Sequence, residues 1–113
     1  MHELAITKNM LDLVLEQAEK AGAKGVGRIN LVIGEMCGVV EECVEFYFDF
    51  LSKGTSAEGA VLSFKMVPTK ARCRGCNRLF ELKEFDWTCP YCQGSKMEIV
   101  AGRELFVESI EVE

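Results

Sequence analysis

The chain has 113 residues, 49% of them apolar, and a formal net charge of −5. This length suits one domain, or one small domain with an insertion, and the apolar content is enough for a core. The net acidity argues against a general nucleic-acid binder, which would need a basic surface. The chain has no apolar run long enough to span a bilayer and no signal-peptide pattern at its start. We therefore expect a cytoplasmic protein that binds neither nucleic acid nor membranes.

Hydrophobic periodicity predicts five elements, in the order helix, strand, helix, strand, strand. Apolar residues three, four or seven apart, such as Leu11, Val14 and Ala18, are typical of one helix face. Alternating apolar residues indicate half-buried strands. The predicted elements are helices over 4–21 and 41–53 and strands over 28–34, 60–67 and 104–112.

Four cysteines lie between the last two predicted strands, as two C-x-x-C pairs: Cys73 with Cys76 and Cys89 with Cys92. Each pair bends the chain so that two thiolates converge on one cation, and two pairs at this separation are typical of a tetrahedral sulfur site. Four sulfur ligands leave no open position for a substrate. We therefore predict a structural Zn(II) site, with iron as the alternative because tetrahedral sulfur suits both metals.

The cysteine segment has further features. A basic cluster surrounds the first pair: Lys70, Arg72, Arg74 and Arg78. It can offset the charge of about −2 on a metal held by four thiolates, or it can bind a partner. Alternating residues from Leu79 to Trp87 predict a hairpin between the two pairs. Cys89 and Cys92 alone also look like a thiol redox pair, but no helical pattern follows them to stabilise a thiolate.

The N-terminus offers a second kind of metal site, because His2 is the one histidine of the chain. The Met1 amine, the His2 backbone nitrogen and the His2 imidazole can close two fused chelate rings on a metal. The Glu3 backbone nitrogen can complete a square plane. Square-planar nitrogen coordination selects Ni(II) or Cu(II). The alternative is a solvent-exposed histidine near a helix start.

These elements predict an α+β fold: a small mixed three-stranded sheet packed by two helices, with an inserted zinc-ribbon subdomain. Residues 1–68 plus 101–113 would form an α/β domain that carries the N-terminal chelate, which the resemblance described below makes a nickel-binding domain, and residues 69–100 the zinc-ribbon domain. The two remaining cysteines, Cys37 and Cys43, are expected to act as small buried apolar residues, with soft metal ligation as the alternative.

Met1-His2-Glu3 followed by the paired cysteine motifs resembles the HypA/HybF family, the nickel-insertion accessory proteins of [NiFe]-hydrogenase. The resemblance covers essentially the whole chain. It extends to intervening segments of the family's pattern: Ile33-Gly34-Glu35, Val39, Glu42, Phe46-Tyr47-Phe48, Gly54-Thr55 and Ala57-Glu58-Gly59-Ala60. Some relatives carry histidines near the second cysteine pair, where this chain has Gln93.

The resemblance implies a nickel metallochaperone that is not an enzyme. Its nickel site would fall on Met1, His2 and Glu3, and its structural zinc site on the four paired cysteines. It also implies a HypB-type GTPase as partner and the [NiFe]-hydrogenase large subunit as recipient of Ni(II), with urease served by some relatives. A homodimer is compatible with the chain. The competing hypotheses are a zinc-ribbon protein-interaction adaptor without nickel transfer and a thiol oxidoreductase.

Overall fold

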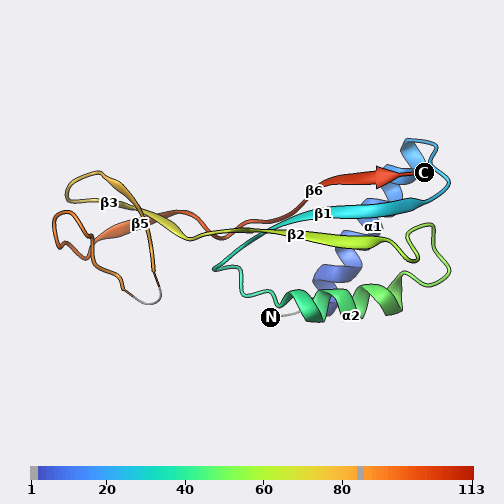
Figure 1. Cartoon of the computed structure of the whole chain (residues 1–113), viewed down its shortest axis with the longest axis horizontal. Helices are drawn as coiled ribbons and strands as arrows, with labels where there is room; N and C mark the ends of the chain where they lie inside the picture. Colours follow the sequence, from blue (N-terminus) through green and yellow to red (C-terminus); the bar gives the residue numbers. More distant parts are fainter. Residues whose placement is uncertain (1–2, 84–85) are drawn as a thin grey trace. The chain divides into compact units, whose positions relative to one another are not determined.

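The computed structural model describes residues 3–83 and 86–113 (Figure 1). These residues form two helices and six strands: α1 (Glu3–Lys20), β1 (Val26–Gly34), α2 (Glu41–Leu51), β2 (Val61–Val67), β3 (Lys70–Cys73), β4 (Leu79–Glu81), β5 (Met97–Ala101) and β6 (Leu105–Val112). The predicted α+β class is confirmed, and the five predicted elements correspond to α1, β1, α2, β2 and β6. Neither helix has the length and apolar character required to cross a membrane.

The chain divides into two compact units. The first unit consists of Met1–Val32, Gly38–Lys65 and Phe106–Glu113. The second unit consists of Ile33–Cys37 and Met66–Leu105. The second unit contains the cysteine segment, together with the end of β1, the turn after it and the last two residues of β2.

The first sheet has the strand order β2-β1-β6 (Figure 1). β6 runs antiparallel to β1, because the Glu113 amide donates to the Gly25 carbonyl at one end and the Gly34 amide donates to the Glu104 carbonyl at the other. β2 runs parallel to β1 (Figure 1). A parallel pair needs a crossover connection, and α2 supplies it. The sheet is therefore mixed, as predicted.

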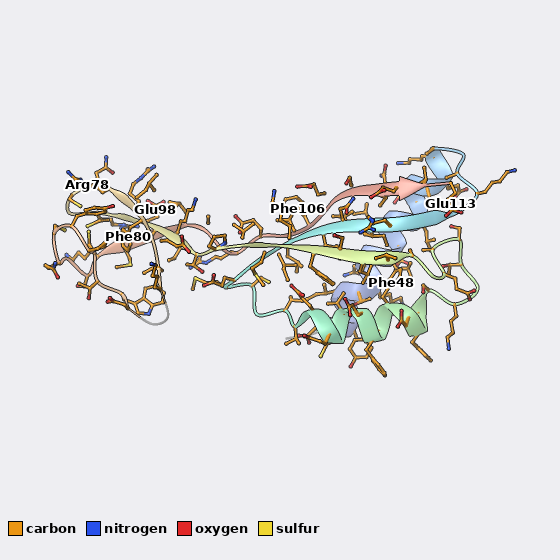
Figure 2. All side chains as sticks on the ribbon, viewed as in Figure 1. Phe48, Arg78, Phe80, Glu98, Phe106 and Glu113 are labelled. Atoms are coloured by element: carbon orange, nitrogen blue, oxygen red, sulfur yellow. The ribbon has the colours of Figure 1, made fainter. Side chains whose placement is uncertain are left out.

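The core of the first unit lies between the helices and this sheet. The predicted stripe of α1 is buried at Leu11, Val14 and Ala18. α2 contributes Val44 and Phe48, and Figure 2 shows Phe48 on the side of α2 that faces the sheet. Phe48 is only 1% exposed, and burying a phenylalanine stabilises a fold by about 2–3 kcal/mol.

The second unit is built on a small antiparallel sheet with the order β4-β3-β5. Ala71 of β3 lies opposite Phe80 of β4 and Ile99 of β5, and these residues form its apolar centre. The hairpin predicted between the cysteine pairs is wrong for the residues that the structure describes there, which leave out Glu84 and Phe85. Leu79–Glu81 folds back onto β3 instead, because the first cysteine pair is itself the reversal that joins these two strands, and Trp87 is left 47% exposed.

Three backbone segments cross closely within the second unit. A Cβ at Gly34 would collide with the backbone carbonyl of Gly102, and a Cβ at Gly102 would lie 2.8 Å from Thr69 Cα. Gly102 also has a φ of +116°, which side chains rarely adopt. The Met36 amide donates to the carbonyl of the buried Gly102, so the close approach also pairs backbone groups.

Candidate metal centre

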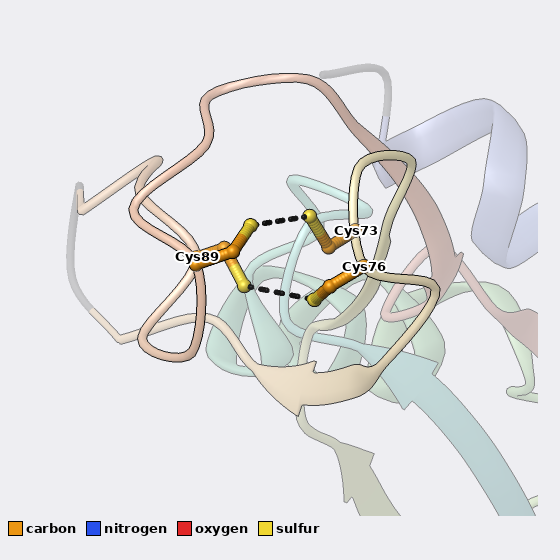
Figure 3. Close-up of side chains that lie close together, drawn as sticks. Cys73, Cys76 and Cys89 are labelled. Carbon is orange, nitrogen blue, oxygen red and sulfur yellow. Dashed lines mark hydrogen bonds between the residues drawn. The ribbon is translucent and has the colours of Figure 1, made fainter.

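The second unit brings the four predicted cysteine ligands together. The sulfur atoms of Cys73, Cys76, Cys89 and Cys92 all lie within 4.8 Å of one another. Across the two pairs, Cys73 Sγ lies 3.4 Å from Cys92 Sγ and Cys76 Sγ lies 3.7 Å from Cys89 Sγ (Figure 3). Zn–S bonds of about 2.3 Å in a regular tetrahedron place sulfurs about 3.8 Å apart. The cluster therefore fits one tetrahedral cation.

Both cysteine pairs use the same backbone arrangement. The Gly75 amide donates to Cys73 Sγ at 3.3 Å, and the Tyr91 amide donates to Cys89 Sγ at 3.4 Å. In each case the amide belongs to the residue two positions after the first cysteine of the pair. Both pairs therefore present their first sulfur to the metal position with the same backbone geometry.

Each pair ends in a residue with left-handed backbone geometry. Asn77 has a φ of 61° and Gln93 a φ of 65°, each immediately after the second cysteine of its pair. Their amides donate back to the carbonyls of Cys73 and Cys89, at 2.8 and 3.0 Å. Asparagine tolerates this region better than glutamine does, so the turn at Gln93 is the more strained of the two.

Burial and titration differ among the four thiols. Cys73 and Cys89 are 1% and 0% exposed, whereas Cys92 is exposed. The backbone amide of Cys76, with other hydrogen-bond donors, outweighs burial and lowers the pKa of the Cys73 thiol to about 6. The Gly94 amide would lower the pKa of Cys92, but neighbouring cysteines and burial raise it to about 11. In this folded arrangement Cys73 therefore carries negative charge more readily than Cys92 does.

The basic side chains near the first pair lie at the surface. Arg72 and Arg74 are exposed, and the Arg78 guanidinium lies over the Tyr91 ring, 4.8 Å from its centroid. This cation–π contact links the residues that follow the first pair to the second pair. It gives Arg78 a packing role in addition to its charge.

Of the three predicted nickel ligands, the structure describes only Glu3. Met1 and His2 lie outside the described residues. Glu3 begins α1, where its carboxylate accepts a hydrogen bond from the Val40 amide at 3.2 Å and its carbonyl accepts one from Thr7 Oγ1 at 2.6 Å. Glu3 therefore connects the start of α1 to the residue before α2, within the first unit.

The two other cysteines have different environments. Cys37 is buried, as predicted, and its amide donates to the Gly34 carbonyl. Cys43 is exposed on α2, so the prediction of a buried apolar residue is wrong there. α2 turns Val44 and Phe48 to the core, and Cys43 is not on that face.

Gly94 supports the four-cysteine site, although it was not among the predicted residues. Its carbonyl accepts the Cys89 amide at 2.8 Å, and a Cβ there would lie 3.3 Å from Cys92 Sγ. Backbone donors such as the Tyr91 amide leave no signal in residue type. A glycine two positions after the last cysteine is the signal that could have been used.

Comparison with known proteins gives consistent matches over the whole chain. A family model described as "Hydrogenase/urease nickel incorporation, metallochaperone, hypA" matches residues 1–112. "Hydrogenase maturation factor HypA" of Dehalococcoides mccartyi is 50% identical over 113 residues, which is 100% of this chain and 95% of that protein. The protein of the same name from Caldanaerobacter subterraneus is 45% identical over 114 residues, with 100% of both chains covered.

Solved structures share the fold. "Solution structure of the Ni metallochaperone HypA from Helicobacter pylori" superposes with a TM-score of 0.70 at 23% identity, covering 99% of this chain and 97% of that one. A structure described as "Solution structure of HypA protein" superposes with a TM-score of 0.76 at 23% identity, covering 100% and 97%. The family model covers residues 1–112, and the Dehalococcoides mccartyi relative is 50% identical over the whole of this chain. The chain belongs to the HypA family of hydrogenase/urease nickel-incorporation metallochaperones.

Proposed function

We propose that this protein carries Ni(II) at its N-terminus and delivers it to the [NiFe]-hydrogenase large subunit, while one Zn(II) ion held by four cysteines keeps the second unit folded. The observation that carries the proposal is the convergence of four sulfurs within 4.8 Å, in a chain of the nickel-incorporation family. A four-sulfur site has no open position for exchange, so cargo nickel needs a separate site.

The zinc half of the proposal rests on the donor set and on the small core. Cys73, Cys76, Cys89 and Cys92 would hold the metal. The second unit buries few large apolar side chains, with Phe80 and Leu82 each 9% exposed. Small units of this kind commonly depend on a metal, whose binding free energy becomes folding free energy.

The nickel half rests on nitrogen chemistry at Met1, His2 and Glu3. Glu3 begins α1, so its backbone nitrogen directly follows the Met1 and His2 nitrogens in the chain and would be the fourth nitrogen of the square plane. The Glu3 carboxylate already accepts the Val40 amide, which supports the backbone nitrogen as the ligand. A cation opposes the helix dipole, and deprotonated amides would offset this by neutralising the metal.

The domain arrangement follows from these two sites. Residues 1–68 plus 101–113 would carry nickel, and residues 69–100 would form the zinc ribbon. The partners we propose are a HypB-type GTPase and the hydrogenase large subunit, with the protein acting in the cytoplasm as a carrier and not as an enzyme. Delivery requires release, and a terminal chelate can exchange its metal more readily than a sealed sulfur site.

The test is a nickel titration of zinc-loaded protein with its native N-terminus, beside His2→Ala and a form whose Met1 amine is acetylated. We expect about one nickel per chain in the native protein, with zinc retained, and loss of this binding in both variants. Acetylation keeps every side chain and removes only the α-amine as a metal ligand, so it is the matched control for His2→Ala. Equal binding by all three proteins would exclude the terminal site.

Glu3 provides a finer test of the ligand set. We expect Glu3→Gln and Glu3→Ala to retain one nickel per chain, because the backbone nitrogen remains in both. Glu3→Ala should lower the free energy of unfolding by about 0.5–1.5 kcal/mol, because it leaves the Val40 amide without this acceptor. Loss of nickel in both variants, with the fold intact, would instead assign the carboxylate as ligand.

The alternative function is a zinc-ribbon adaptor that binds proteins without transferring nickel. Trp87 and Tyr91 favour it, because they are 47% and 54% exposed on the second unit, and exposed aromatic residues often anchor interfaces. The nickel titration separates the two functions, since an adaptor has no use for the terminal chelate.

A further inference from the structure

The first sheet has two edge strands, and they are protected to different degrees. Edge strands present unpaired backbone groups that can pair with another chain, and proteins usually blunt them with charge. β6 carries Glu108 and Glu111 and is flanked by Glu104 and Glu113. β2, with the sequence Val-Leu-Ser-Phe-Lys-Met-Val, carries Lys65 as its one charged residue. β2 is therefore the edge that is more open to pairing.

The hydrogen bonds to β1 determine which groups of β2 point outward. The Glu35 amide donates to the Val67 carbonyl, so Val67 bonds toward β1. Successive residues of a strand bond to alternate sides. The amides and carbonyls of Leu62, Phe64 and Met66 therefore point away from β1, toward the open edge of the sheet.

The sequence of β2 is symmetric in polarity about Phe64. We propose that two copies of this chain associate by antiparallel pairing of β2 with β2, centred on Phe64, which joins two three-stranded sheets into one of six strands. In this register Leu62 faces Met66, Ser63 faces Lys65 and Val61 faces Val67 of the second copy. Apolar residues meet apolar residues, and no like charges are opposed.

Other registers are less favourable for physical reasons. Two residues that lie opposite each other in an antiparallel pair must both direct their backbone groups toward the partner strand, or both away from it. The two-fold axis must therefore pass through a residue of β2, and the alternative registers are centred on a neighbouring residue. Centring on Lys65 would place two lysines opposite each other. Centring on Ser63 would pair fewer residues and put Val61 against Lys65. The Phe64 register uses all seven residues and about six backbone hydrogen bonds.

The exposure of β2 supports a second copy as the occupant. Leu62 and Phe64 pack on the core, whereas Met66 shares their side of the strand but is 49% exposed. In the proposed pair, Leu62 of the second copy covers Met66, and the two Phe64 residues meet at the axis. Val61, which is 52% exposed on the other face, meets Val67. The order of apolar and polar residues in β2 is the same in both directions from Phe64, so a second copy of β2 places a matching residue opposite each position. This inference does not depend on nickel binding.

The test uses opposite charges at one position. Ser63→Lys places a positive charge opposite Lys65 twice in the dimer, and Ser63→Glu places a negative charge there. We expect the dimer dissociation constant to rise about tenfold with lysine and to fall with glutamate. Nonspecific repulsion between chains of net charge −5 predicts the reverse order, so the two explanations are distinguishable.

The measurement is sedimentation equilibrium of untagged, zinc-loaded protein over a concentration series. Reducing agent is required because Cys43 is exposed and could form disulfide-linked dimers. Circular dichroism and zinc content confirm that each variant is folded. A wild-type protein that stays monomeric at every concentration, or a dimer that lysine strengthens, would overturn the proposal.

Hydrogen exchange on the wild-type protein provides an independent readout. The Phe64 amide points to the open edge, so its exchange should slow as protein concentration rises. The Ser63 amide bonds toward β1 and should be protected equally at all concentrations. Exchange at Phe64 that does not change with concentration would overturn the proposal even if the protein dimerises through another surface.

Discussion

At the scale of single residues, the candidate zinc site depends on backbone donors as much as on its cysteines. The Gly75 and Tyr91 amides donate to the first sulfur of each pair, and the Cys76 amide contributes most to lowering the pKa of Cys73. Residue type determines which atoms can bind a metal. The turn within the first pair lowers the pKa of Cys73 and so determines which sulfur of that pair carries the charge.

The four cysteine ligands lead to a prediction about zinc and pH. Without metal the second unit is expected to unfold, so its thiols return to the ordinary cysteine pKa of about 8.5 and each must lose a proton to bind zinc. We therefore expect zinc affinity to fall by up to about four orders of magnitude for each unit that the pH drops below about 8. Competition with a chelator of known protonation constants measures this. A shallower dependence that steepens only below pH 6 would instead mean that the metal-free unit keeps the backbone donors that lower the pKa of Cys73 to about 6.

At the scale of elements, the positions of the strands follow from pairing partners that lie far apart in the chain. β1 lies between β2 and β6, and its end passes the close crossing of Gly34 with Gly102. Periodicity located β1, β2 and β6, because alternation is visible within a few residues. It indicated extended chain from Leu79 but not the pairing of β4, since Leu79–Glu81 is short and its partner is determined by the reversal at the first cysteine pair. It did not locate the short strands β3 and β5.

The crossing predicts a large difference between two glycine substitutions. Gly34→Ala should lower the free energy of unfolding by about 3 kcal/mol, because its Cβ would collide with the Gly102 backbone carbonyl, which cannot move aside as a side chain can. Gly25→Ala is the matched control, since its Cβ would lie 3.5 Å from the nearest atom, the Ser56 carbonyl oxygen. We expect a change of about 0.5 kcal/mol or less there. Urea unfolding of the zinc-loaded proteins measures both, and equal values would refute the role of the crossing.

At the scale of the whole molecule, the two units depend on different sources of stability. The first unit has a core built from α1, α2 and the β2-β1-β6 sheet. The second unit has a small core around Ala71 and Phe80 that includes two of the cysteines. Burial stabilises the first unit, and we expect metal binding to supply much of the stability of the second.

This difference predicts the result of metal removal. A strong chelator should unfold the second unit and leave the helical far-ultraviolet signal almost unchanged, because α1 and α2 both belong to the first unit. Trp87, the single tryptophan, lies in the second unit, so its fluorescence should report the loss of structure. Zinc added back should restore it. Loss of helical signal in step with the fluorescence would mean that the units unfold together.

The sequence by itself determined the features that depend on nearby residues. The spacing of Cys73, Cys76, Cys89 and Cys92 predicted a common site, and apolar periodicity located both helices and the three longer strands. These signals are local, because a cysteine pair or a helix face is defined within a few positions of the chain.

Only the tertiary structure decided which segments meet. It placed Leu79–Glu81 on β3, exposed Cys43, left the polarity-symmetric β2 at an edge, and brought Gly34 against Gly102. Each of these depends on contacts between residues distant in sequence. Local propensity does not specify such contacts, because they form only when the competing ways of burying apolar surface and satisfying backbone hydrogen bonds are resolved for the whole chain.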